Sequence, residues 1–225
     1  RCSVLMLHRV FAKSRVTAEP YLALCRAVSA FVGVKNRDRI YNSLCGVTWP
    51  SEALRPEKVI LGSGTVVRMR PHNHEFDFKA VLGGSLGYEP NVFRFLEQRM
   101  GMYDAVIEIG ANVGVFTLFF AKKLAIQKPS ARVFCFEPSR EAYKRLLENL
   151  QLNSVDNVHP FNAAIGAVSG FDDFYEPSDH LTNGSMLREF AEIFSAEGEE
   201  MPRNGDRWRK PFDCTWRRKE NSHQD

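Results

Sequence analysis

Four residues in one short segment, Glu108, Gly110, Asn112 and Gly114, have the types and spacing of a ligand-binding turn. Glycine permits tight turning and close approach of a ligand, and the N–H groups at the start of a following helix can bind a negative group. The carboxylate of Glu108, just before the turn, could accept hydrogen bonds from an ammonium group. The segment therefore suits a ligand with both an amine and a carboxylate, as in the methionine part of S-adenosylmethionine.

Two further polar residues come directly after apolar runs. Glu137 follows the run 132–136, and an acidic residue at this point of an open α/β sheet can accept hydrogen bonds from both ribose hydroxyls. Asn162 follows the run 158–161 and could contact an adenine edge, with small alanines beside it leaving room for the ring. Together these residues predict a nucleoside site, with S-adenosyl-L-methionine as the cofactor.

Other interpretations of these residues stay open. The glycine segment could be a NAD-type site or a purely structural turn, although E-x-G-x-N-x-G lacks the first glycine of G-x-G-x-x-G and places an acid before the turn. The alternative for Glu137 is a solvated carboxylate at a strand end, and the alternative for Asn162 is a turn-forming residue.

Alternating strands and helices must position these side chains. The apolar runs 105–107, 132–136 and 158–161 have the composition of buried parallel strands. Between them lie an apolar segment of helical length, 113–125, and an amphipathic segment, 139–152, whose polar side includes Asn149. This alternation predicts an α/β fold with a doubly wound, Rossmann-like parallel sheet, whose ligands bind at the carboxyl ends of the strands.

The flanking segments have other patterns. Residues 1–57 are expected to form a basic, partly helical leader, followed by a β-hairpin of 59–61 with 65–69 and a helix over 91–100. A second hairpin is expected over 164–175 and a short helix over 187–194. Residues 196–225 are polar and rich in Arg and Lys, which predicts a disordered tail.

The motifs in combination resemble the FkbM-type family of S-adenosylmethionine-dependent methyltransferases. The segments are Y-D-A-V-I-E-I-G-A-N-V-G-V-F-T (103–117), V-F-C-F-E-P (133–138), E-N-L-Q-L-N (148–153) and N-A-A-I (162–165), with weaker matches at Tyr88-Glu89 and Asn183-Gly184-Ser185. The resemblance implies a methyltransferase domain over 58–195 that methylates a hydroxyl of a sugar, glycolipid or polyketide-type small molecule. It also implies that Glu108, Gly110, Asn112 and Gly114 line the methionine end and Glu137 the ribose.

One departure from the family leaves a second function open. The family has a K-I-D-V-E-G type segment after a fourth parallel strand, and nothing like it occurs between Asp172 and Asp225. We therefore expect a C-terminally truncated chain that holds the first half of the sheet, with an unpaired edge at 105–108 that favours self-association. The alternative function is a catalytically inactive remnant or interaction module that keeps the cofactor-binding half of the fold.

No catalytic base is assigned from the sequence. His72-Asn73-His74 near Glu75 and Asp77 lacks a partner cluster with metal-ligand spacing, so exposed loop histidines and no metal are expected. His180 could act as a base for a hydroxyl substrate, with an ordinary loop residue as the alternative.

Composition excludes several protein classes. The 225 residues are 44% hydrophobic and 25% charged, as in an ordinary globular protein, and the net charge of +3 gives no reason to expect a nucleic-acid partner. Residues 1–60 are more basic, with ten Lys/Arg against four Asp/Glu. The five cysteines include no C-x-x-C pair, which argues against a zinc site and favours a reducing, cytoplasmic location. The early apolar run 21–34 is too short to span a membrane.

Overall fold

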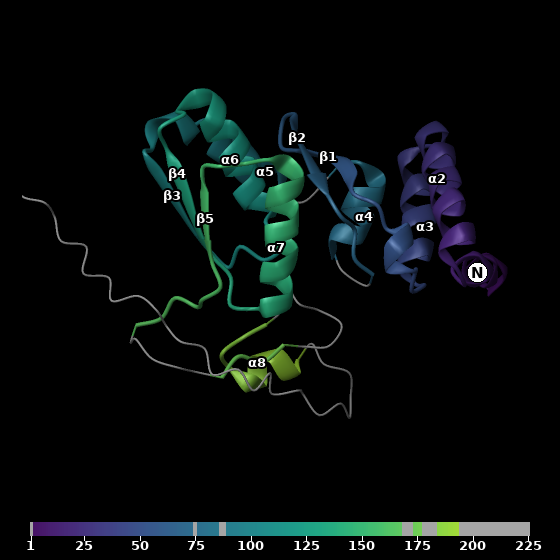
Figure 1. Ribbon diagram of the computed structural model, residues 1–225. Helices are drawn as coiled ribbons and strands as arrows, with labels where there is room; N and C mark the ends of the chain where they lie inside the picture. Colours follow the sequence, from purple (N-terminus) through teal and green to yellow (C-terminus); the bar gives the residue numbers. More distant parts are fainter. Residues whose placement is uncertain (1, 74–75, 86–88, 168–172, 177–183, 194–225) are drawn as a thin grey trace, which may run out of the picture.

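The computed structural model describes residues 2–73, 76–85, 89–167, 173–176 and 184–193 (Figure 1). Three helices at the N-terminus are followed by a hairpin, two further helices and a parallel sheet with its crossover helices. The chain therefore has the α/β fold that the sequence predicts. The predicted tail over 196–225 lies outside the described residues.

The N-terminal unit consists of helices α1 (Cys2–Phe11), α2 (Arg15–Phe31) and α3 (Val34–Cys45), with a short 3-10 turn at Ser51–Ala53. Their apolar sides enclose Trp49, which is 2% exposed, and contact Phe78 and Leu82 of helix α4 (Phe76–Gly83). Inside this core His8 pairs through Nδ1 with the Tyr21 hydroxyl and through Nε2 with the Ser43 hydroxyl, each at 2.8 Å. The predicted helical leader is thus a packed bundle.

Strands β1 (Glu57–Leu61) and β2 (Thr65–Met69) form the expected antiparallel hairpin. Alternate residues of both strands point into the core of the α/β unit, as the period of two requires. The turn between them contains Gly62 and Gly64, both with positive φ. Helix α5 (Pro90–Glu97) follows, and the predicted helix over 91–100 is divided, because Met100–Met102 form a separate 3-10 turn.

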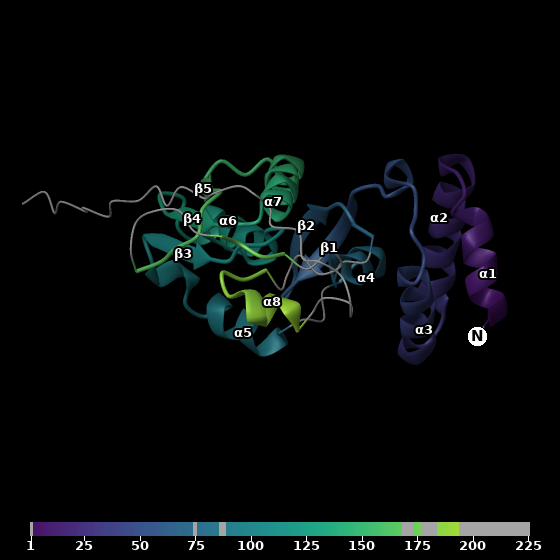
Figure 2. The same cartoon turned by 90° about the horizontal axis from the view of Figure 1, so that it is seen from below.

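The parallel sheet contains β3 (Ala105–Ile109), β4 (Arg132–Phe136) and β5 (Val158–Phe161), in that order. Helices α6 (Val115–Gln127) and α7 (Arg140–Asn153) are its crossovers and lie on the same side of the sheet (Figures 1 and 2). The described strands form a Rossmann-like parallel sheet, and the strands and crossover helices agree with the sequence-based expectation.

Burial differs between the side of the sheet that the crossover helices cover and the opposite face of β3. Val133 and Cys135 are buried with Leu118 and Leu146 from the crossover helices. On the opposite face Ile107 is 69% exposed and Ile109 is 65% exposed. Within the described residues the second edge of β3 pairs with no strand.

Of the segments predicted after β5, the short helix over 187–194 is present, whereas the first strand of the hairpin is not. Residues 164–167 form no strand, and the rest of the predicted hairpin includes 168–172, outside the described residues. Tyr175 instead forms an antiparallel bridge with Ser185, and helix α8 (Arg188–Glu192) follows on the carboxyl-terminal side of the sheet (Figure 1). None of the helices among the described residues is both long and apolar enough to cross a membrane.

Candidate functional site

The turn between β3 and α6 brings three of the predicted residues together in left-handed backbone conformations. The φ angles are 79° at Gly110, 49° at Asn112 and 91° at Gly114. The N–H groups of Gly110 and Ala111 both donate to the carbonyl of Phe136, at 2.9 and 3.0 Å. The turn is therefore fixed to the carboxyl end of β4, where open α/β sheets bind their ligands.

The two glycines meet different surroundings. A Cβ built on Gly110 would have no heavy atom within 4 Å, so this position faces open space. A Cβ on Gly114 would lie 2.5 Å from Cδ1 of Leu146, on helix α7. Gly110 therefore leaves room for a ligand against the backbone, whereas Gly114 lets the two crossover helices pack closely.

Glu108 lies at the end of β3, where the sequence predicts it. Its Oε2 accepts a hydrogen bond of 2.6 Å from the Thr117 hydroxyl on α6. The pKa of Glu108 is raised to about 7, mainly by desolvation; the Thr117 hydrogen bond opposes the shift and the charge of Glu137 adds to it. This environment disfavours the charged form of the carboxylate, and a cationic partner would stabilise it.

Glu137 makes more contacts inside the protein than the sequence suggests. The residue is only 6% exposed, and its Oε2 accepts the N–H of Asn112 at 2.7 Å while its Oε1 accepts the N–H of Ser139 at 2.8 Å. Burial raises the pKa of Glu137, these two N–H groups oppose the shift, and the nearby charge of Glu176 adds to it. The alternative of a solvated carboxylate at a strand end is therefore wrong.

The side-chain amides of Asn112 and Asn162 differ in their hydrogen bonds. The Oδ1 of Asn112 is buried and has no hydrogen-bond partner among the described residues. The Nδ2 of Asn162 donates to the carbonyl of Glu137 at 2.8 Å and to that of Pro138 at 3.3 Å, which leaves its Oδ1 for a further contact. A buried Oδ1 without a partner in the described chain, two residues after Gly110, is an acceptor that a ligand donor could satisfy.

Glu176 is a buried acidic residue near Glu137 that sequence reasoning missed. It is 6% exposed and close enough to Glu137 to raise the pKa of that carboxyl. It follows Tyr175, whose bridge to Ser185 returns the chain to the sheet's carboxyl-terminal side. No motif surrounds Glu176, so only the acidic residue type could have drawn attention to it.

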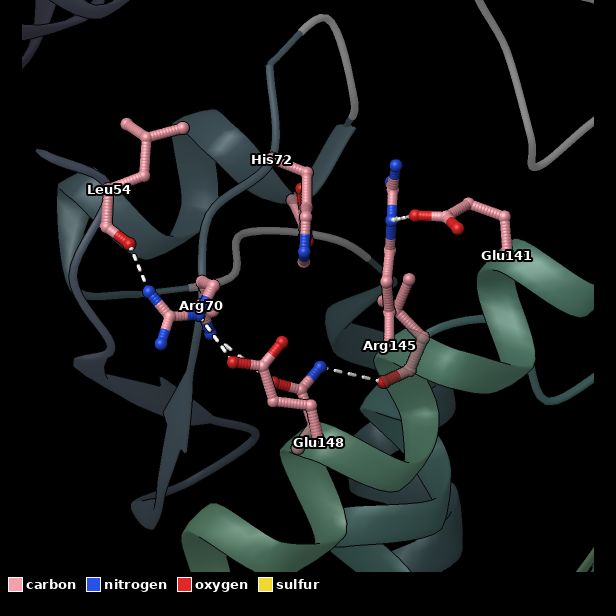
Figure 3. A network of polar contacts seen from close by, with 9 residues as sticks. Leu54, Arg70, His72, Glu141, Arg145 and Glu148 are labelled. Carbon is pink, nitrogen blue, oxygen red and sulfur yellow. Dashed lines mark hydrogen bonds and ion pairs between the residues drawn. The ribbon is translucent and has the colours of Figure 1, made fainter. Parts of the chain in front are cut away.

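A polar network behind the turn connects it to the hairpin (Figure 3). Asn149 on α7 donates from Nδ2 to the carbonyl of Val113 at 2.9 Å and accepts the N–H of Arg70 at 3.2 Å. The Arg70 guanidinium pairs with Glu148 and donates to the Leu54 carbonyl at 2.7 Å. Asn149 is fully buried, so the expectation that it lies on a polar, outward side of the helix is wrong.

The histidine segment has a structural explanation. His72 Nδ1 lies 3.2 Å from Oδ2 of Asp77, and the side chains are 17% and 1% exposed. His72 is therefore no exposed loop residue, contrary to expectation. His74, Glu75 and His180 lie outside the described residues, and the part of the chain that is described contains no cluster suited to a metal ion.

No protein-family model matches the chain, and no curated protein matches it. Among solved structures, TYW2 of P. horikoshii in complex with MeSAdo is 20% identical, with a TM-score of 0.31 over 49% of this chain and 37% of that one. TYW2 of M. jannaschii in complex with AdoMet is 21% identical, with a TM-score of 0.32 over 52% of this chain and 48% of that one. The chain thus spans less than half of each structure. The FkbM resemblance stays a prediction from the motifs.

Proposed function

We propose that the chain binds S-adenosylmethionine at the carboxyl ends of β3, β4 and β5 and serves methyl transfer to a hydroxyl group. The observation that carries this proposal is the open space at Gly110, in the glycine turn that follows the partly buried Glu108 and is hydrogen-bonded to the buried carboxylate of Glu137. Such a site offers acceptors for an ammonium and a ribose, and a backbone that a ligand can approach.

Each predicted residue has a role that its contacts permit. Glu108 would accept the ammonium of the cofactor, and the Gly110 to Gly114 turn would line the methionine part, with Oδ1 of Asn112 as an additional acceptor. Each oxygen of Glu137 already accepts one N–H and keeps a lone pair for a ribose hydroxyl. Oδ1 of Asn162 would accept from the adenine amino group, since its Nδ2 is bonded to backbone carbonyls.

The bound cofactor would supply an electrophilic methyl group, and the chain would hold the reactants in position. A hydroxyl acceptor must lose its proton during the transfer, which calls for a base, and we assign that role to no described residue. By the FkbM resemblance, the acceptor is a hydroxyl of a sugar, glycolipid or polyketide-type molecule. The described cysteines Cys25, Cys45 and Cys135 are free, which supports a reducing compartment such as the cytoplasm.

Calorimetric titration of the full chain with S-adenosylmethionine and with its demethylated product tests the proposal. We expect both to bind with one site per chain and NAD not to bind. The matched control for Glu108→Gln is Glu52→Gln, because Glu52 is an exposed carboxylate on the 3-10 turn before the hairpin. A folded chain that binds neither compound at millimolar concentration would refute the proposal.

A second candidate function is favoured by the exposed face of β3. Ile107 and Ile109 present two large apolar side chains on a strand whose second edge is unpaired among the described residues. Such a surface suits an interaction module or self-association. Two results together would favour this candidate over the enzyme. The chain would bind the cofactor without methyl transfer to sugar, lipid or polyketide hydroxyls, and light scattering would show that it associates.

A further inference from the structure

The end of α2 carries an apolar stripe that nothing in the described chain covers. Leu24, Val28 and Phe31 follow one another at helical spacing, so they lie along one side of α2. They are 59%, 45% and 91% exposed. Phe31 is therefore almost as accessible as in an extended chain, which is costly for an aromatic side chain in water.

Helix α1 has a similar exposed side. Met6 is 72% exposed, Leu7 49% and Val10 52%, whereas His8 on the opposite side is buried against α2 and α3. Figures 1 and 2 show the three N-terminal helices at the end of the molecule farthest from the parallel sheet. These apolar side chains are therefore remote from the candidate cofactor site.

The helices that carry the stripe have an excess of basic residues. Residues 2–46 contain seven Lys/Arg and two Asp/Glu, and one of those acids, Glu19, is paired with Arg15 and Arg55. Lys35 and Arg39 are exposed one turn apart on α3, directly after Phe31, and form no ion pair within the described ranges. The N-terminal helices thus combine exposed large apolar side chains with a net positive charge.

A groove opens next to Phe31. It has a volume of about 520 Å³ and lies between α2, α3 and the end of α4. Ala30 and Val32, the two neighbours of Phe31 in the chain, line it together with the guanidinium-bearing side chains of Arg26 and Arg37. Arg26 is paired with Glu57, which leaves Arg37 as the cation available to a phosphate group in this groove.

We propose that the N-terminal three-helix unit docks on an anionic lipid bilayer. Phe31, Val28 and Leu24 insert among the acyl chains at the interface, while Lys35, Arg39 and Arg37 contact lipid phosphates. Charge complementarity selects this occupant, because exposed large apolar side chains flanked by Lys and Arg are the surface that interfacial helices present to anionic lipid. The proposal is independent of the methyl-transfer proposal.

Co-sedimentation of the full chain with vesicles tests the inference. We expect partition onto phosphatidylcholine vesicles that contain phosphatidylglycerol, weak partition onto phosphatidylcholine alone, and loss of binding as salt screens the charges. Phe31→Ser should lower the partition coefficient roughly tenfold to a hundredfold, because it removes one buried aromatic side chain. Lys35→Ala/Arg39→Ala should lower it roughly 30-fold.

Matched controls come from exposed positions elsewhere. Ile126→Ser removes an apolar side chain that is 81% exposed on α6, and Arg68→Ala/Lys144→Ala removes two exposed charges from the α/β unit. Both should leave the partition coefficient unchanged. Circular dichroism of every variant confirms that the helices are retained.

Three results would overturn the proposal. The first is no partition onto either vesicle, and the second is an equal effect of the control and test substitutions. The third is a concentration-dependent dimer by light scattering that Phe31→Ser dissociates, without vesicle binding, since the stripe would then be occupied by a second copy of the chain.

Discussion

The carboxylate of Glu137 accepts the backbone N–H of Asn112 across a distance of 2.7 Å. The same carboxylate accepts the N–H of Ser139, the residue before α7. One buried side chain therefore fixes the glycine turn relative to the start of the next crossover helix. The residue that is expected to bind the ribose also holds the site together.

Glu137→Ala should affect both stability and binding. Two buried N–H groups would lose their acceptor, so we expect the free energy of unfolding to fall by about 2 to 4 kcal/mol in urea denaturation. Affinity for S-adenosylmethionine and its demethylated product should fall tenfold to a hundredfold by calorimetry. Glu141→Ala, which removes only an exposed pair with Arg145, is the control. A lower stability with unchanged affinity would disprove the ribose role.

The free energy of unfolding should depend on pH through the ionisation of Glu108. Its pKa is raised from 4.5 to about 7, so the folded state binds the proton more tightly than the unfolded state. Protonation of Glu108 therefore stabilises the folded state. This contribution to the free energy of unfolding is fully present below about pH 4.5 and is lost as the pH rises to about 7. Glu108→Gln should remove this loss, which would show as a flatter plot of unfolding free energy against pH. An identical pH profile for the variant would contradict the raised pKa.

Cofactor binding should release a proton below pH 7. A cationic ammonium beside Glu108 favours the charged carboxylate, so the affinity should rise as the pH increases from 5 to 7. Calorimetry in buffers of different ionisation enthalpy measures the proton release. The Glu108→Gln variant should show no such release, and a release that persists in this variant would assign it to another group.

Gly110→Ala and Gly114→Ala should separate binding from folding. Both positions have positive φ, so each alanine costs about 1 kcal/mol or more in backbone strain. The Cβ at position 114 would additionally meet Leu146 at 2.5 Å, so this variant should be the less stable one in thermal unfolding. The Cβ at position 110 points into open space, so this variant should be the better folded and should still lose cofactor affinity. Equal affinity of Gly110→Ala and the unaltered chain would place the ligand elsewhere.

Asn149→Ala should weaken the connection between the hairpin and the glycine turn. The substitution leaves the carbonyl of Val113 and the N–H of Arg70 without their buried partner, so we expect a loss of about 2 to 4 kcal/mol in unfolding free energy. Gln151→Ala, two residues later and exposed, should change it by less than about 0.5 kcal/mol. Similar losses for both variants would argue against the network.

The sequence alone predicts those parts of the fold that depend on residues close together in the chain. Buried parallel strands are continuous apolar runs, and a turn that needs left-handed backbone uses glycine, so β3, β4, β5 and the turn at Gly110 could all be predicted. The hairpin of β1 and β2 followed from its alternation and its glycine-rich turn.

Contacts between distant segments could not be predicted in this way. The hydrogen bonds of Asn149 join residues that are 36 and 79 positions away, and helical periodicity alone placed it on a polar side. The bridge between Tyr175 and Ser185, which carries Glu176 to the site, also has no local pattern. Tertiary contacts decide these positions.

The most direct test of the cofactor site is a two-dimensional amide NMR titration of the full chain with the demethylated product of S-adenosylmethionine. We predict that the largest changes in amide chemical shift occur at Gly110, Asn112 and Ser139. The amides of α1 to α3 should be unchanged. Saturating ligand without shifts at the glycine turn, or shifts confined to the groove beside Arg37, would contradict this prediction.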